Sequence, residues 1–311
     1  MTMVLNAILH LALLIAMPPL LFGVVNKTKA LYAGRVGAPF LQPYYDIAKL
    51  LRKGMVLSRT TTWVFRAAPA VTLAAVAAAG LLAPAGDTPA IVSFSGDFIL
   101  FAYLFGPARF FTTSAALDTG SAFEGMGASR EVSFAVLTEP ALFFAFLVLA
   151  KLSGSLSLSG MLAPAASRIA AGGAGAMGAV APQVLIAAGL FIVFLAENSR
   201  IPVDDPTTHL ELTMIHEVMV LDHSGPLFGL IEYASAMKFF VLGSVILGVA
   251  VPAYPGLPWL DWPIFAGGLL ALSALVGVVE SVMARLRMPR VPTLLISAVL
   301  LCGAAFIMLL R

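Results

Sequence analysis

Long apolar stretches constrain this sequence more than any other feature. A membrane-spanning helix needs about 20 mostly apolar residues. Eight such stretches are present, near residues 3–25, 68–84, 98–118, 128–151, 181–197, 227–251, 262–284 and 291–310. Only 11% of the residues are charged, against roughly 25% in a soluble domain. We therefore predict an all-α, multi-pass membrane protein, built over residues 1–311 as a single bundle of eight transmembrane helices.

Basic residues fall on one side of these predicted helices. The first loop holds eight of them between Lys27 and Arg66, and the seventh holds three between Arg285 and Arg290, whereas the second and sixth loops hold none. Cytoplasmic loops carry the excess of Lys and Arg. We therefore predict that loops one, three, five and seven are cytoplasmic and that both termini lie outside.

Two of the predicted cytoplasmic loops contain helical patterns. In loop one, apolar residues recur at helical spacing from Tyr44 to Leu51, and charged residues take the other face. In loop five, Asp205-Pro206 resembles a helix start and Gly225-Pro226 a stop. We predict an amphipathic helix in each loop. The basic helix of loop one fits either lipid headgroups or a partner protein.

The histidines of loop five invite a metal-site interpretation. His209, His216 and His223 are spaced by seven residues. On a helix this spacing separates neighbours by about 10 Å, too far to share one ion. The only cysteine, Cys302, cannot hold a cysteine-ligated cluster by itself. We predict no metal site and no cofactor on this chain.

Charged residues inside the predicted spans are the strongest functional signal. They are Asp118, Glu131, Glu139, Glu197, Glu232, Glu280, Arg109 and Lys238. A charge at the bilayer centre costs roughly 2.5 to 3.5 kcal/mol on insertion scales, so such residues are paired or hydrated. Static pairs, for example of Arg109 with a glutamate, would lock helices together. Because six acids exceed two bases, we favour a hydrated path for protons or sodium, and Glu139 is the foremost candidate for a residue that titrates on this path.

Two loop motifs resemble those of a known family. The runs Gly34–Pro43 (GRVGAPFLQP) and Ala196–Asp204 (AENSRIPVD) resemble loops one and five of the subunit 1 family of respiratory complex I. The run Arg130–Phe134 is similar to the start of that family's fourth helix. The stretch from Asp205 to Glu211 has Thr and His where the quinone-reducing branch has acids. Taken with Leu117–Phe123 and Leu212–Glu217, it resembles the energy-converting nickel-iron hydrogenases of the formate hydrogenlyase and hydrogenase-4 type.

The resemblance implies a subunit of the bacterial cytoplasmic membrane that anchors a hydrophilic hydrogenase module and links electron transfer to ion movement. Its expected partners are the hydrogenase small and large subunits, an iron–sulfur protein, antiporter-like membrane subunits and the lipid bilayer, with no nucleic acid. Iron–sulfur clusters and the nickel–iron centre are expected on the partners. The residues expected to dock the hydrophilic module are Arg35, Gln42, Asp46, Lys49, Arg200, Asp204, Asp205, Glu211 and Glu217.

Two other functions stay open at this point. One is the quinone-chamber subunit of a complex I-like oxidoreductase, which shares the architecture. The other is a stand-alone ion-coupled transporter, although the chain lacks the strong internal repeat of many such transporters. We predict no catalytic residue on this chain, because no nucleophile–base or metal-ligand spacing is present.

Overall fold

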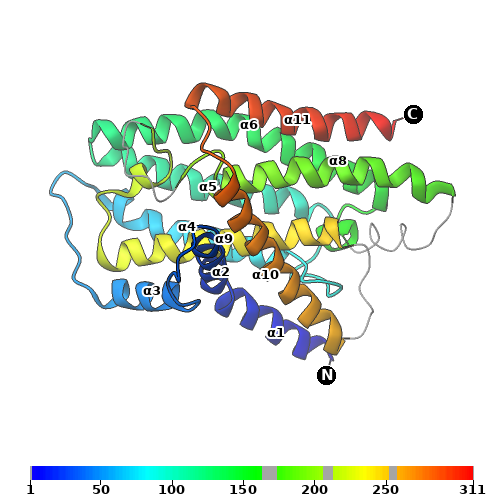
Figure 1. The fold of residues 1–311 in the computed structure, drawn as a ribbon, viewed down its shortest axis with the longest axis horizontal. Coiled ribbons are helices and arrows are strands. Elements are labelled where there is room, and N and C mark those ends of the chain that lie inside the picture. Colours follow the sequence, from blue (N-terminus) through cyan, green and yellow to red (C-terminus); the bar gives the residue numbers. More distant parts are fainter. Residues whose placement is uncertain (1, 163–173, 206–212, 252–257, 311) are drawn as a thin grey trace.

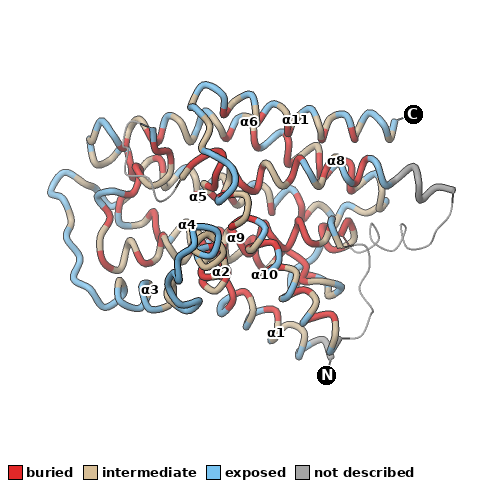
Figure 2. Tube along the Cα trace, in the orientation of Figure 1, coloured by how far each residue is buried: buried red, intermediate tan, exposed pale blue. Residues whose placement is uncertain are grey.

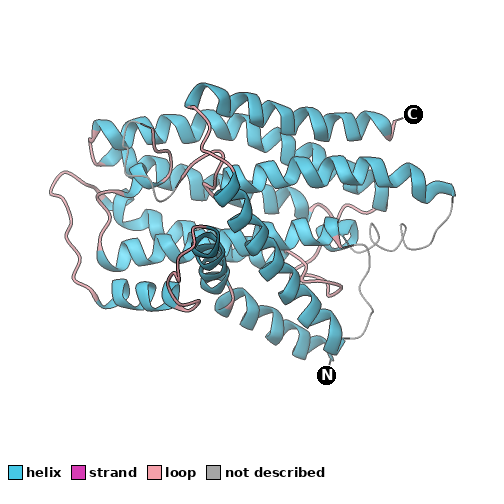
Figure 3. Ribbon diagram, viewed as in Figure 1, coloured by secondary structure: helices cyan, strands magenta, loops and turns pink. Residues whose placement is uncertain are grey.

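The computed structural model describes residues 2–162, 174–205, 213–251 and 258–310, and these form helices and loops without a strand (Figures 1 and 3). In chain order the helices are α1 (Thr2–Ala16), α2 (Pro18–Tyr32), α3 (Gln42–Arg52), α4 (Trp63–Leu82), α5 (Asp97–Asp118), α6 (Ala122–Ser153), α8 (Ala174–Glu197), the 3-10 helix η1 (Glu217–Val220), α9 (Gly225–Ala250), α10 (Pro258–Val282), the 3-10 helix η2 (Met288–Arg290) and α11 (Val291–Met308). The predicted all-α class is confirmed for this part of the chain.

Six helices of the described part are long and apolar enough to cross a membrane, and a seventh is added if α1 and α2 form one bent span. The two helices meet at an angle of 48°. Pro18 and Pro19 open α2, and proline at that point removes backbone donors that would continue α1. The predicted count of eight is not confirmed, because α5 does not qualify by composition. It carries Asp97, Arg109 and Asp118.

The core is centred on α9, the most buried of the long apolar helices (Figure 2). Helices α2, α4, α8 and α10 all pack against it. The ring of Phe239 on α9 lies 4.7 Å from that of Phe194 on α8 and 5.5 Å from that of Phe22 on α2, measured between centroids. Offset and edge-on aromatic pairs of this kind stabilise helix contacts. They hold α8 and α9 side by side, with the end of α8 against the middle of α9.

Loop one contains the helix α3, which lies against α2 and α9. Its Tyr44, Ile47 and Leu50 are half-buried, whereas Lys49 and Arg52 are exposed. The Tyr44 hydroxyl donates a hydrogen bond to the carbonyl of Ala16, at the break between α1 and α2. Loop one is thus attached to the bundle along one face of α3.

Loop five differs from the predicted helix. Residues 206–212 lie outside the described residues, and residues 213–224 contain the 3-10 helix η1 and no α-helix. The carboxylate of Asp204 accepts hydrogen bonds from the backbone N–H groups of Ile215 and His216, each at 3.1 Å. A helix would have to pair those donors with its own carbonyls. The side chain of Asp204 therefore folds the loop back on itself instead.

Candidate functional site

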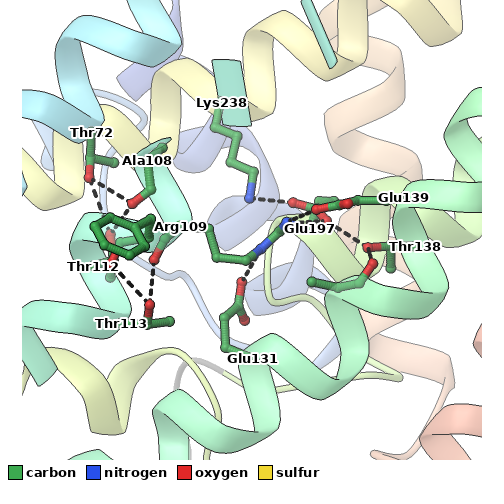
Figure 4. Close-up of polar contacts among 12 residues, drawn as sticks. Thr72, Ala108, Arg109, Thr112, Thr113, Glu131, Thr138, Glu139, Glu197 and Lys238 are labelled. Atoms are coloured by element: carbon green, nitrogen blue, oxygen red, sulfur yellow. Dashed lines mark hydrogen bonds and ion pairs between the residues drawn. The ribbon is translucent and has the colours of Figure 1, made fainter. Parts of the chain in front are cut away.

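Five charged side chains from four helices meet inside the bundle (Figure 4). This group, the charged cluster, consists of Arg109 on α5, Glu131 and Glu139 on α6, Glu197 on α8 and Lys238 on α9. All five were among the eight ionisable residues predicted in the spans. No two of them come from one helix except Glu131 and Glu139, so the bundle itself brings them together.

Arg109 lies at the centre of the charged cluster. Its guanidinium nitrogens lie 3.4 Å from a carboxylate oxygen of Glu131 and 2.5 Å from one of Glu139. A third contact of 2.6 Å joins the guanidinium to Glu197. An arginine side chain offers five donors in a fixed plane, which suits contact with several carboxylates at once. Arg109 therefore ties α5 to α6 and α8.

Glu197 is the acid contacted by both cations of the charged cluster. Its second oxygen lies 2.7 Å from Nζ of Lys238, and its first accepts a hydrogen bond of 2.9 Å from the Thr138 hydroxyl. Its side chain is 11% exposed, against 51% for Glu139. Sequence reasoning singled out Glu139 for its place in the middle of a predicted span. In the structure Glu197 is the more buried of the two acids, and it contacts both cations, whereas Glu139 contacts Arg109 alone.

The other predicted intramembrane acids lie outside the charged cluster. Asp118 accepts hydrogen bonds from the backbone and hydroxyl of Thr62, at 2.6 and 3.0 Å, and so holds in place the residue that caps the start of α4. Glu280 on α10 pairs with Lys29 at 2.8 Å and with Arg200 at 3.4 Å. The predicted acids therefore do not all belong to one cluster of contacting side chains.

Glu232 borders a separate cavity of about 130 Å³ between α2, α3 and α9. Asn26 and Asp46 line the same cavity. Asp46 also accepts a hydrogen bond of 2.8 Å from the side-chain amide of Gln42. Asp46, predicted as a docking residue, thus lines this cavity, and the docking candidate Gln42 is hydrogen-bonded to it on α3.

The predicted docking residues divide into an exposed and a buried group. Arg35 and Lys49 of loop one are exposed. Arg200 and Asp204 are 6% and 1% exposed, and each is paired inside the chain, Asp204 with Arg285 at 2.9 Å. Buried side chains cannot touch a partner that rests on the surface. Their position indicates a role in shaping loop five rather than in direct contact.

Of the remaining docking candidates, Asp205 and Glu217 are half-buried, and Glu211 lies outside the described residues. Burial raises the pKa of Glu217 to about 7, and the nearby carboxylates of Glu232 and Asp204 contribute to the rise. A carboxyl group in this state changes protonation near neutral pH.

A second cavity, of about 60 Å³, lies between α4, α5, α9 and loop five. By volume it has room for a few water molecules. Its polar lining includes Arg109, Glu131, Glu197, Lys238, His216 and His223. The charged cluster therefore opens onto a space that can hold water.

The histidines of loop five reach the charged cluster through this cavity, which sequence reasoning did not foresee. Their spacing suggested only a metal site, and the described residues contain no group able to hold a metal ion. His209 lies outside the described residues. Burial lowers the pKa of both His216 and His223. Only the folding of loop five over α4 and α9 could reveal that the two rings share a cavity with carboxylates.

Comparison with known proteins agrees with the motifs of loops one and five. A family model described as NADH dehydrogenase matches residues 4–311. The chain belongs to this family. It is 30% identical over 306 residues to formate hydrogenlyase subunit 4 of Escherichia coli (strain K12), covering 93% of each chain. It is also 30% identical over 250 residues to hydrogenase-4 component C of the same strain, covering 80% of this chain and 76% of the relative.

More distant members of the family belong to quinone oxidoreductases. The chain is 27% identical over 227 residues to an NADH-quinone oxidoreductase subunit of Rubrobacter xylanophilus, covering 72% of this chain and 66% of the relative. Its fold also matches a chain in the structure of the membrane-bound sulfane sulfur reductase, an archaeal respiratory membrane complex, with a TM-score of 0.79 at 19% identity. That match covers 99% of this chain and 100% of the other. The chain is a multi-pass membrane subunit of this family, as its apolar helices and loop motifs predict.

Proposed function

We propose that this chain is the membrane-anchoring and coupling subunit of an energy-converting nickel-iron hydrogenase complex. Two relatives support the hydrogenase branch, formate hydrogenlyase subunit 4 and hydrogenase-4 component C, which match at higher identity and over more of the chain than the quinone oxidoreductase relative does. In this proposal the iron–sulfur clusters and the nickel–iron centre belong to partner subunits, and antiporter-like membrane subunits lie beside the bundle.

The proposed orientation places loops one, three, five and seven in the cytoplasm of a bacterium and both termini outside. The excess of Lys and Arg in loops one and seven supports it. In this arrangement α5 is the eighth span, its charge at Arg109 being paired by carboxylates of α6 and α8. A buried and fully paired charge is the usual form of an ionisable residue at membrane depth.

The coupling part of the proposal rests on the net charge of the charged cluster. Three carboxylates, of Glu131, Glu139 and Glu197, face two cations, of Arg109 and Lys238. With all groups ionised the cluster has one uncompensated negative charge. A low-dielectric site of this kind favours uptake of one proton or one small cation. The cluster therefore suits a group that loads and releases a single positive charge.

Docking, in this proposal, uses the exposed basic side chains of loop one and the folded shape of loop five. Arg35 and Lys49 are the exposed residues that can contact a hydrophilic subunit. Arg200 and Asp204 hold loop five against α10 and against Arg285. They act on docking through the shape of the loop.

The coupling role is tested by Glu197→Gln in the assembled complex, reconstituted into liposomes. Hydrogen turnover and ion uptake are measured together, with pH-sensitive and sodium-sensitive dyes. We expect Glu197→Gln to preserve assembly and hydrogen turnover and to abolish ion uptake. The same change at Glu139 should impair uptake less, because its side chain is half-exposed.

The matched control is Asp97→Asn, at the first residue of α5. Asp97 is fully buried and accepts hydrogen bonds from the backbone N–H groups of Phe94 and Leu158, outside the charged cluster. Asp97→Asn should leave the ratio of ions to electrons unchanged. Unaltered ion uptake in Glu197→Gln, with the complex intact, would refute the role assigned to the cluster.

The docking role is tested by reversing charge at the surface of loop one. The double variant Arg35→Glu, Lys49→Glu should release the hydrophilic module from washed membranes into the soluble fraction, because interfacial charge reversal turns attraction into repulsion. The control is Lys151→Glu, which changes an exposed residue in the last turn of α6, and this variant should retain the module. Full retention in the double variant would count against docking on loop one.

The quinone-chamber role is the second candidate, supported by the similarity to the NADH-quinone oxidoreductase relative. It predicts that the purified complex reduces a soluble quinone and that quinone-site inhibitors block this activity. The hydrogenase proposal predicts hydrogen turnover that such inhibitors do not affect.

A further inference from the structure

His223 lies at the border between the surface of loop five and the cavity beside the charged cluster. Its chain neighbour Asp222 is exposed, whereas His223 is 7% exposed and lines the cavity. The imidazole stacks on the ring of Phe65, with centroids 3.9 Å apart and planes inclined by 16°. This stacking holds the ring in one orientation between the loop surface and the cavity.

The hydrogen bonds of His223 define which nitrogen can accept a proton. Its Nε2 lies 3.3 Å from the carbonyl oxygen of Phe65. A carbonyl only accepts, so in the neutral ring Nε2 carries the hydrogen and Nδ1 carries a lone pair. Nδ1 is buried and has no hydrogen-bond partner among the described residues. A buried lone pair at the edge of a cavity is an acceptor for a water molecule or for a proton.

His216 connects this position to the carboxylates electrostatically. Its ring lines the same cavity. The charges that act on it are those of Glu131 on α6, Glu197 on α8, Asp204 in loop five and Lys238 on α9. Among these charges Glu131 has the largest influence, and it favours the imidazolium form. Arg109 of α5 lines the cavity opposite.

We propose that His223 and His216 form a proton-loading pair for the charged cluster, which takes up a proton from water at the loop surface and delivers it to Glu131. In the first step an N–H bond forms at Nδ1 of His223 as an O–H bond of a hydronium ion breaks. The N–H bond at Nδ1 then breaks as the proton passes to water in the cavity, and His216 takes up and releases a proton in the same way until an O–H bond forms on the carboxylate of Glu131. Each transfer returns the ring to its neutral form, so the net change is one proton moved from bulk water to Glu131.

The charges around the pair fit this role, which rests on the proposed coupling function of the cluster. Burial disfavours the imidazolium form of both rings, so neither holds a proton permanently at neutral pH. The carboxylates of Asp222 and Glu131 favour it at the two ends of the route. A site that loads and releases a proton needs such opposing influences.

Nitrogen NMR of the full chain in lipid bilayers tests the loading itself. The chain has four histidines, His10, His209, His216 and His223, so ¹⁵N-histidine labelling with single His→Gln variants assigns each ring. We expect the rings of His216 and His223 to be neutral at neutral pH and to become imidazolium as the pH falls below the usual imidazole range, because burial lowers the pKa of both. Glu131→Gln should lower the midpoint of His216 by about one pH unit, the low end of the effect of a nearby opposite charge.

A ring of His216 or His223 that takes up no proton before the chain unfolds in acid, or a His216 midpoint unmoved by Glu131→Gln, overturns the proposal. This result does not depend on whether the complex couples ion movement. It therefore separates failure of the proton-loading pair from failure of the proposed function.

The assembled complex supplies the second measurement, with His10→Gln as the matched control. His10 is also buried, also bonds a carbonyl through Nε2 (Gly80, 3.1 Å) and also has an unpartnered Nδ1 among the described residues, but it does not line this cavity. His223→Gln keeps a donor for the Phe65 carbonyl and removes the proton site. It should slow coupled proton uptake by about a hundredfold, the low end for losing a positioned proton carrier. Equal rates in the two variants would contradict the assignment.

Discussion

Gly127 of α6 marks the point where loop five presses most closely on the bundle. A Cβ atom added there would lie 2.4 Å from Cγ1 of Val218 and 2.9 Å from both the carbonyl oxygen of Ile215 and Cγ of Met219. All three distances are shorter than side chains normally tolerate. Gly127→Ala therefore has to push η1 and its neighbours away from α6.

The expected change in unfolding free energy is the sum of two opposing effects. Alanine in place of glycine in a helix stabilises by about 0.5–1 kcal/mol. Overpacking of a filled site costs about 1–3 kcal/mol. Gly125, two residues earlier in α6, has only Leu117 Cδ2 near its Cβ position, at 3.9 Å. Gly125→Ala should gain the helix effect alone, so the two variants should differ in unfolding free energy by about 1–3 kcal/mol.

Thermal unfolding of the detergent-solubilised chain measures this difference, and cleavage after Glu217 by a glutamate-specific endoprotease reports on the loop directly. We expect Gly125→Ala to unfold at or above the wild-type temperature. Gly127→Ala should unfold below it and should be cut faster. Equal stability and equal cleavage of the two variants would show that loop five does not rest on α6 as described.

Three further changes test other parts of the structure. The pKa of Glu217 is raised to about 7, so at low pH the buried carboxyl is neutral and does not destabilise the fold. As the pH rises from its unfolded to its folded pKa, the buried carboxyl increasingly destabilises the fold. Glu217→Gln should therefore gain roughly 2 kcal/mol of stability relative to wild type between low and neutral pH, measured by thermal unfolding. Asp118→Ala removes the acceptor of two hydrogen bonds at the start of α4 and should cost about 1 kcal/mol, whereas Asp118→Asn should cost less in the same unfolding assay. Gly23→Ala places a Cβ 1.9 Å from the carbonyl oxygen of Phe40 and should detach loop one, seen as faster proteolysis, while Gly54→Ala, whose Cβ meets nothing within 4 Å, should not.

The length of the apolar stretches predicted the long helices well, because each span depends on its own residues and on the lipid around it. The prediction failed where residues far apart in the sequence determine the local structure. The predicted span 3–25 continues as α2 to Tyr32 beyond a bend at Pro18. The loop-five helix was predicted from Asp205 and Gly225, but the carboxylate of Asp204 takes backbone donors that such a helix would need.

The members of the charged cluster could be predicted, and their arrangement could not. The cost of burying a charge singles out Arg109, Glu131, Glu197 and Lys238 in the sequence. Which acid meets both cations depends on how α8 turns its last residue toward α5 and α9, and that rotation is set by packing around Phe194. No local pattern contains this information. The same limit explains why the histidines of loop five were not connected with the carboxylates.

The short segment after α8 connects the two halves of the proposed function. Glu197 ends α8 and contacts Arg109 and Lys238, while Arg200, three residues later, pairs with Glu280 of α10. The backbone N–H of Arg200 still bonds the carbonyl of Leu195 at 2.8 Å. A displacement of loop five by a docked subunit is therefore transmitted through a tight turn, without a flexible linker, to the carboxylate held by both cations. Electrostatic energy depends steeply on distance at such short separations, so we expect small movements of the loop to change the proton affinity of the charged cluster.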